Sequence, residues 1–241
     1  MRMKNRNLWV ISAALFLLFA ASGIYAAYEN ARSVQASVAG ETPKVVVIDA
    51  GHGGMDGGAV SVDGTCEKEI NLALAQRLQS LLQCAGVETV MTRTTDDSIH
   101  DPQYTTVRKQ KISDIHNRLK IMEETDDSVF VSIHQNFFTS ARYYGTQTFY
   151  SDTDPRSRTL AQCIQDAVVS SVQPENKRAI KKSGTEIYLL YHAVRPAVMV
   201  ECGFLSNPQE AALLKTPKYQ TKMALAIMKG IFDFWEKVEG V

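Results

Sequence analysis

From residue 44 onward, short runs of apolar, β-branched residues alternate with longer stretches in which apolar residues recur every three or four positions. The short runs are typical of strands and the longer stretches of amphipathic helices. The predicted order is strand 45–48, helix 70–85, strand 87–92, helix 112–124, strand 129–134, strand 146–150, helix 158–172, strand 186–190 and strand 197–202. This alternation predicts a single α/β domain, with a twisted, mostly parallel or mixed sheet flanked by helices.

Signals at the helix ends sharpen the prediction. Gly86 follows helix 70–85 and is expected to stop it, because glycine readily adopts the left-handed conformation found after helix ends. Asn207, Pro208 and Glu210 together predict a helix start with an N-cap, a proline in the first turn and a capping-box glutamate. Another helix is expected after Thr216, which precedes a proline.

The N-terminal part of the chain has a different pattern. Three basic residues, at positions 2, 4 and 6, precede an apolar run over residues 8–28 that is long enough to cross a bilayer, which takes about 20 residues. We therefore expect residues 1–28 to be a signal peptide or an uncleaved membrane anchor, and the rest of the chain to be exported. Residues 29–43 are small and polar and predict a linker, with the main domain at 44–241.

Charge and cysteine content exclude some classes of function. The chain has 26 basic and 26 acidic residues, and because several basic ones lie near the N-terminus, the domain itself is slightly acidic. It has no basic stripe of the kind that binds nucleic acid. The four cysteines show no C-x-x-C spacing, which favours scattered buried thiols for most of them.

Polar residues at the ends of predicted strands are the candidates for chemistry, because ligands of open α/β sheets gather at the carboxyl ends of strands. His52 follows the first strand, His134 ends the strand 129–134, and Glu201 lies near the end of a continuously apolar run typical of a central strand. Glu67 lies in a predicted loop before helix 70–85. Two histidines and a carboxylate are the ligand set of a catalytic zinc ion, and a second carboxylate could act as general base.

Several alternatives stay open on these residues alone. A histidine at a strand end can be a hydrogen-bonded structural residue, and Glu201 could form a buried salt bridge with Arg93 or Arg118. Glu69 competes with Glu67 for the ligand position, although both cannot face the same way once a helix has begun.

Other chemistry-bearing side chains are weaker candidates. His100 and His116 have polar or charged neighbours and are expected to be solvated, while His192 is a lesser candidate for the site. Cys202 as a nucleophile is disfavoured, because neighbouring strand residues point to opposite faces and Glu201 is expected to face the site. Cys66 could contact a metal adventitiously.

Several segments of the sequence match one known family in order and register. They are IDAGHGGMDGGAV, CEKEINLALAQRL, MTRTTDD, VSIHQNFF and AVMVECGFLSNPQEAALL. On these segments the chain resembles the zinc-dependent N-acetylmuramoyl-L-alanine amidases of bacterial cell walls. HNRL, GTQTFY and EIYLL, together with the N-terminal apolar segment and no wall-binding module, look most like the germination-specific, spore-cortex branch.

The resemblance implies that His52, Glu67 and His134 bind zinc and that Glu201 is the catalytic glutamate. It also implies hydrolysis of the amide between muramic acid and the L-alanine of the peptidoglycan stem peptide. The chain departs from many relatives at Ala50, where they have proline, and at Tyr191, where they have arginine.

The spore-cortex branch implies a biological role as well. We expect the cleavage to begin muramic-δ-lactam formation for germination, together with a separate deacetylase, in the space between the forespore and mother-cell membranes. An activating partner protein is a further expectation. The competing hypotheses are a non-catalytic wall-binding module with a structural zinc site, and a general vegetative cell-wall amidase.

The loop after the first strand receives two expectations of its own. Asp49 is expected to accept a hydrogen bond from a ligand imidazole and so to hold it in place, as zinc sites commonly require. The glycines that surround His52 are expected to permit a tight turn and to leave a floor without side chains beside the metal.

Overall fold

The computed structural model describes residues 44–239. The segments expected at 1–28 and 29–43 lie outside the described residues. Within the described part of the chain, every helix is too short or too polar to cross a membrane.

Six strands of the described chain form one mixed sheet. They are β1 (Val45–Ala50), β2 (Glu88–Met91), β3 (Ser128–Asn136), β4 (Gln147–Tyr150), β5 (Lys181–Lys182) and β6 (Ala197–Phe204). The spatial order is β2-β1-β3-β6-β4-β5. Strands β2, β1, β3 and β6 are parallel, β4 runs antiparallel to β6, and β5 is parallel to β4. The prediction of an α/β domain with a mostly parallel or mixed sheet is therefore confirmed.

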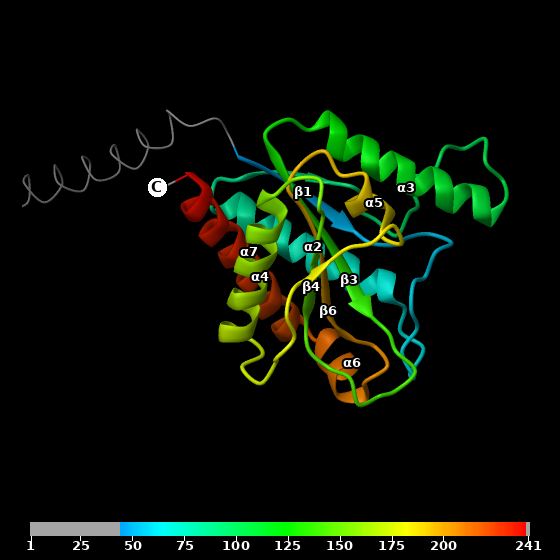
Figure 1. Ribbon diagram of the computed structural model, residues 1–241. Coiled ribbons are helices and arrows are strands. Elements are labelled where there is room, and N and C mark those ends of the chain that lie inside the picture. Colours follow the sequence, from blue (N-terminus) through cyan, green and yellow to red (C-terminus); the bar gives the residue numbers. More distant parts are fainter. Residues whose placement is uncertain (1–43, 240–241) are drawn as a thin grey trace, which may run out of the picture. The chain divides into compact units, whose positions relative to one another are not determined.

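Helices cover both faces of this sheet (Figure 1). They are α2 (Glu67–Cys84), α3 (Val107–Glu124), α4 (Arg156–Ser171), α5 (Tyr188–Tyr191), α6 (Pro208–Leu214) and α7 (Pro217–Glu239). Helices α2, α4 and α7 enclose the larger apolar core on one face. On the other face, α3 and α5 pack over a smaller apolar core.

Side chains that alternate along the strands separate the two cores. On β1, Val46 and Ile48 face the larger core, whereas Val47 between them faces the smaller one. On the face covered by α3 and α5, the apolar row gives way toward the carboxyl ends of the strands to polar side chains, among them His134 and Glu201. The candidate residues therefore lie at the edge where the parallel strands end.

One predicted strand is wrong. Residues 186–190 are not a strand; the chain there passes from a loop into the short helix α5, whose Leu189 and Leu190 are buried in the smaller core. A run of four or five apolar residues fits a strand and a buried helical turn equally well, so packing against α3 decides its conformation. Helix α3 also begins at Val107, five residues before the predicted start at 112. The prediction missed its first turn because that turn is mostly polar and exposed and so shows no apolar period.

The signals at helix ends are confirmed with one exception. Gly86 has a φ of 81°, as expected for the residue that ends α2. The Asn207 side chain caps α6 by accepting hydrogen bonds from the backbone N–H groups of Gln209 and Glu210. The predicted capping-box role of Glu210 is wrong: its carboxylate accepts hydrogen bonds from the backbone of Gly145 and Phe204 instead.

Candidate metal centre

His52, Glu67 and His134 come together at the carboxyl ends of β1 and β3. One ligand atom from each lies within 4.8 Å of the other two. Nε2 of His52 is 3.2 Å from Oε2 of Glu67, and Nδ1 of His134 is 3.0 Å from Oε1 of Glu67. The carboxylate therefore lies between two imidazoles, which are separated by 4.9 Å between ring centroids.

Glu67 is held firmly in this position. It is the first residue of α2 rather than part of a preceding loop, and its side chain is buried. The backbone N–H groups of Ala59 and Gln135 and the side-chain amide of Asn71 all donate hydrogen bonds to its carboxylate. Glu69 is exposed on the same helix, so the structure brings Glu67, not Glu69, into the cluster.

The charges around Glu67 favour its ionised form. Burial alone would raise the pKa of Glu67, but hydrogen bonds and positive charge from His134 and His52 outweigh burial and hold it well below its usual range. A buried, ionised carboxylate between two imidazoles is a donor set that suits a divalent cation.

Asp56 orients the imidazole of His52. Its Oδ2 lies 3.0 Å from Nδ1 of His52, which leaves Nε2 facing Glu67. The second oxygen of Asp56 accepts a hydrogen bond of 2.8 Å from the ammonium group of Lys111 on α3. Burial lowers the pKa of His52, but the hydrogen bonds with Asp56 and Glu67 outweigh that effect and raise it to about 9.

Two buried arginines fix the backbone that carries His52. His52 has a φ of 63°, a left-handed conformation that non-glycine residues seldom adopt. Arg118 donates hydrogen bonds of 2.7 Å to the carbonyl of His52 and 2.8 Å to that of Ala50. Arg93 donates to the carbonyls of Ala50 and Gly51. These contacts stabilise a conformation that would otherwise cost about 1–3 kcal/mol.

Two glycines leave the space that the ligand side chains occupy. A Cβ at Gly51 would lie 2.6 Å from Cδ2 of His134 and closer still to two other atoms of that ring. A Cβ at Gly58 would lie 2.5 Å from Oε2 of Glu67, and Gly58 also has a φ of 67°. The expectation of a tight turn with positive φ is therefore confirmed at Gly58. At Gly51 the space without a side chain is filled by the His134 ring, so a floor open to substrate stays a prediction.

Glu201 lies beside this cluster on the neighbouring strand. It pairs in register with His134 across parallel strands β3 and β6, so the two side chains share one face of the sheet. Its Oε2 is buried and has no hydrogen-bond partner among residues 44–239. Burial raises the pKa of Glu201 to about 7; the charge of His134 opposes this rise and that of Glu67 adds to it. Such a group can accept and release a proton near neutral pH.

The salt-bridge alternative for Glu201 is wrong within the described part of the chain. The guanidinium groups of Arg93 and Arg118 contact the loop carbonyls, and Arg118 also pairs with Asp49 and Asp114.

The expected support of a ligand imidazole by Asp49 is wrong as well. Asp49 accepts hydrogen bonds from Arg118, Thr92 and Ser132, while Asp56 holds the imidazole of His52.

The remaining candidates lie outside the cluster. Cys202 is buried in the larger core, on the sheet face opposite Glu201, and burial raises the pKa of its thiol, so a nucleophilic role is wrong. Cys66 precedes α2 and is not in the cluster. His192 instead contacts the rings of Tyr188 and Tyr191. As predicted, His116 is exposed, whereas His100 is half-buried, with Nδ1 2.9 Å from the hydroxyl of Ser98.

Sequence reasoning missed three residues that hold the cluster together: Asp56, Asn71 and Lys111. Asn71 lies four residues after Glu67, a spacing that places both on one helix face, and this signal could have identified it. Asp56 lies four residues after His52 in the glycine-rich loop. Lys111 reaches Asp56 from a helix distant in sequence, and no local pattern announces that contact.

Comparison with known proteins agrees with this geometry. Residues 46–233 match the family of N-acetylmuramoyl-L-alanine amidases. The germination-specific N-acetylmuramoyl-L-alanine amidase of Bacillus subtilis (strain 168) is 35% identical over 192 residues, which cover 80% of this chain and 80% of that protein.

Solved structures show the same similarity. The CwlD amidase from Clostridioides difficile, determined in complex with the GerS lipoprotein, matches with a TM-score of 0.78 and 39% identity, over 80% of this chain and 99% of that one. The amidase AmiC2 of Nostoc punctiforme matches with a TM-score of 0.68 and 28% identity, over 82% and 99% of the two chains. The chain therefore belongs to the N-acetylmuramoyl-L-alanine amidase family and is an amidase that acts on peptidoglycan.

Proposed function

We propose that the protein is a zinc-dependent amidase in which His52, Glu67 and His134 hold the metal and Glu201 carries the proton. The observation that supports this most strongly is the buried oxygen of Glu201, which has no hydrogen-bond partner among residues 44–239 and belongs to a side chain on the same face as His134. A buried carboxyl without a partner is costly unless another group compensates it. A water molecule and the substrate amide would supply that group.

The residues divide the work of amide hydrolysis between them. Bound zinc supplies positive charge that polarises the amide carbonyl and acidifies water. Glu201 accepts the proton of the attacking water and then donates it to the nitrogen of L-alanine as the amide bond breaks. Asp56 keeps Nε2 of His52 directed at the metal, and Gly51 and Gly58 leave room for the imidazole and carboxylate ligands.

Digestion of purified muropeptides tests this proposal. Wild-type protein with zinc is expected to release stem peptides with a free N-terminal L-alanine, and Glu201→Gln is expected to bind zinc normally and yield no product. Glu69→Gln changes an exposed glutamate of α2 that points away from the cluster, so it serves as control and should leave cleavage unchanged. Binding of muropeptides by the wild type without any product would favour a non-catalytic wall-binding module, and wild-type rates from Glu201→Gln would contradict the role of Glu201.

We further propose that the substrate is spore-cortex peptidoglycan and that the cleavage starts muramic-δ-lactam formation, with a separate deacetylase. The similarity to a germination-specific amidase supports this role. Export to the space between the forespore and mother-cell membranes follows from the role and from the apolar N-terminal segment. Spores that lack the protein should contain no muramic-δ-lactam. Normal lactam content would favour a general vegetative amidase.

We also propose that a partner protein supports activity, because a 39% identical relative has been determined in complex with a lipoprotein. Such a partner would raise zinc affinity or substrate access. Addition of an extract fraction that contains the partner should then raise the amidase rate at subsaturating zinc. Full activity and tight zinc retention by the purified chain alone would contradict the proposal.

A further inference from the structure

The sheet face that carries His134 and Glu201 continues outward onto β4 and β5. Glu201 pairs directly with Gln147 across antiparallel strands β6 and β4, and Phe149 on β4 pairs with Lys181 on β5. Directly paired residues project from the same face of a sheet, and so do residues two apart on one strand. Gln147 and Lys181 therefore lie on the face of the candidate metal centre.

A guanidinium group lies at the end of this row. Arg178 donates a hydrogen bond of 2.8 Å from Nη2 to Oε1 of Gln147, and its guanidinium carbon is 4.9 Å from the centroid of the Phe204 ring. Its Nε is buried and has no hydrogen-bond partner among the described residues. One side chain, Gln147, thus separates Arg178 from Glu201.

No carboxylate in residues 44–239 forms a salt bridge with Arg178 or Lys181. The nearest acidic groups are otherwise engaged: Glu210 accepts hydrogen bonds from the backbone of Gly145 and Phe204, and Glu186 accepts one from the backbone of Gly184. Lys182, by contrast, points to the other face and pairs with Asp152. Burial raises the pKa of Glu210 and the charge of Arg178 opposes that rise, but the two groups form no salt bridge. Arg178 therefore has hydrogen-bond donors left for a ligand.

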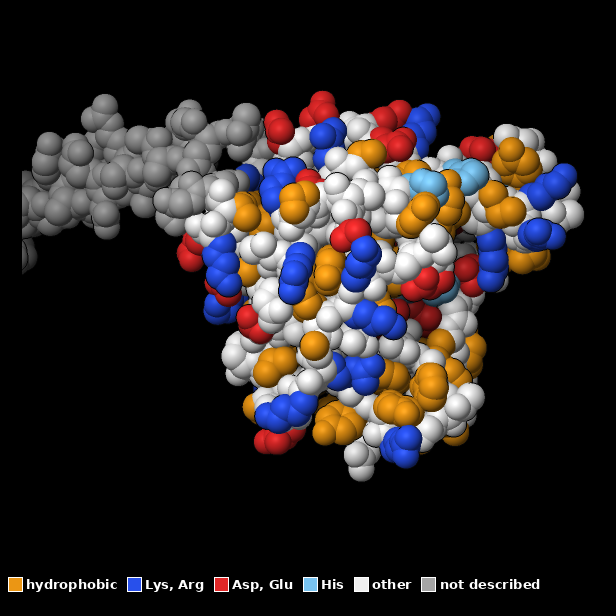
Figure 2. All heavy atoms as spheres, in the orientation of Figure 1, with side chains coloured by type: hydrophobic (Ala, Val, Ile, Leu, Met, Phe, Trp, Pro, Cys, Tyr) orange, Lys and Arg blue, Asp and Glu red, His pale blue; other side chains and the backbone are white. Residues whose placement is uncertain are grey.

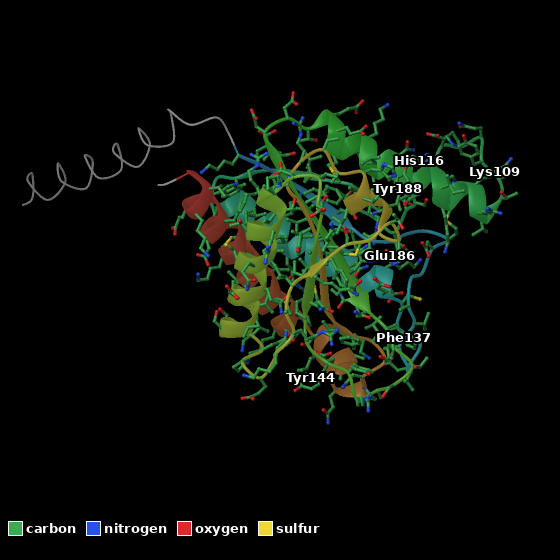
Figure 3. All side chains as sticks on the ribbon, in the orientation of Figure 1. Lys109, His116, Phe137, Tyr144, Glu186 and Tyr188 are labelled. Carbon is green, nitrogen blue, oxygen red and sulfur yellow. The ribbon has the colours of Figure 1, made fainter. Side chains whose placement is uncertain are left out.

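The surface around the candidate metal centre carries both acidic and basic side chains. Figure 2 shows acidic side chains and a histidine in a hollow of this face, with basic side chains beside it. In Figure 3, Glu186 and Phe137 lie on either side of the carboxyl end of β3. A substrate that enters with its scissile amide at Glu201 would extend along this face past Gln147.

We propose that Arg178, with Lys181 beyond it, binds the free carboxylate of the acidic residue that follows L-alanine in the stem peptide. The proposal rests on the proposed amidase function. Paired strand residues lie about 5 Å apart and each peptide residue spans about 3.3–3.6 Å, so one or two residues reach from Glu201 past Gln147. Guanidinium groups bind carboxylates with two parallel hydrogen bonds, a geometry that amides and hydroxyls do not match.

Matched substrates test this subsite. Two muropeptides would be compared that differ only in whether the carboxylate after the L-alanyl residue is free or amidated. The wild type is expected to cleave the free acid more efficiently. Arg178→Gln should lower kcat/KM for the free acid by about 10- to 100-fold, mainly through KM, and should change it little for the amidated substrate. Arg178→Lys should retain part of the preference, and Lys182→Gln should behave as wild type.

Equal cleavage of both substrates by the wild type, or an equal loss on both in Arg178→Gln, would overturn the proposal. Binding of the two muropeptides to Glu201→Gln protein, measured by titration calorimetry, separates this subsite from the amidase function. If the wild type cleaved neither substrate, the amidase function would fail. Tighter binding of the free acid that disappears on Arg178→Gln would still support the subsite, and indifferent binding would overturn it.

Discussion

Gly51→Ala is expected to displace His134 and weaken metal binding. The φ of Gly51 lies outside the left-handed range, so alanine adds a methyl group without strain in the backbone. That methyl carbon would lie 2.6 Å from Cδ2 of His134, and ordinary contacts begin at 3.4 Å, so the ring must move by about 0.8 Å or more. Metal–ligand distances tolerate only about 0.2 Å.

The expected loss is large. Substituting residues that merely orient a ligand weakens metal affinity by about 10- to 100-fold, so displacement of a ligand should weaken it by about 100-fold or more. This corresponds to at least about 2.7 kcal/mol of binding free energy. The metal-free protein should lose about 1–3 kcal/mol of unfolding free energy through overpacking.

Competition with a chromogenic chelator measures the zinc affinity, and urea denaturation of the metal-free protein measures the change in stability. Gly57→Ala is the matched control in the same loop, because its methyl group would meet only the Cys66 side chain, at ordinary distances of 3.5 Å to Sγ and 3.9 Å to Cβ. It should bind zinc as the wild type does. Wild-type zinc affinity in Gly51→Ala would refute the steric argument and the assignment of His134 as a ligand.

The other predictions concern the groups behind the ligands. Asp56→Ala should weaken zinc affinity by about 10- to 100-fold, since His52 loses its orienting partner; an unchanged affinity in the chelator assay would count against this. Arg118→Met should lower the unfolding free energy by about 3–5 kcal/mol in urea denaturation, because Asp49 is left buried without its partner; a change under 1 kcal/mol would be inconsistent with the pairing. Burial would raise the pKa of Asp49, yet the charges of Arg118 and His134 and the hydrogen bonds from Ser132 and Thr92 together outweigh burial and lower the pKa from 3.8 to about 2. The stability linked to this ionisation, roughly 2 kcal/mol, is complete above about pH 4 and is lost as pH falls toward 2. Asp49→Asn should reduce the fall in unfolding free energy between about pH 4 and pH 2. An unchanged fall would mean that other carboxylates cause it.

Much of the fold could be predicted from the sequence because its elements are long and periodic. Helix α2 and the apolar strands β1, β3 and β6 each carry enough buried residues to reveal their period. Residues 186–190 show where that reasoning ends. Their few apolar residues carry no period, and packing of α5 against α3 selects a helical turn.

The cluster itself was predictable for a related reason. Strands that run parallel deliver the residues at their carboxyl ends to one edge, so His52, His134 and Glu201 could be expected to meet without knowledge of distances. The groups that orient the ligand imidazoles could not be predicted in this way. Whether Asp49 or Asp56 would support an imidazole depends on where Arg118 and Lys111 lie, and both reach the loop from α3, about 60 residues away in sequence.

Titration of zinc into metal-free protein, with amide hydrolysis followed at each addition, tests the assignment of the metal and of Glu201 most directly. We predict that activity rises linearly and reaches its plateau at about one zinc per chain, and that Glu201→Gln binds the same single equivalent without gaining activity. Full hydrolysis by the metal-free protein, or activity in Glu201→Gln equal to that of the wild type, would contradict this assignment.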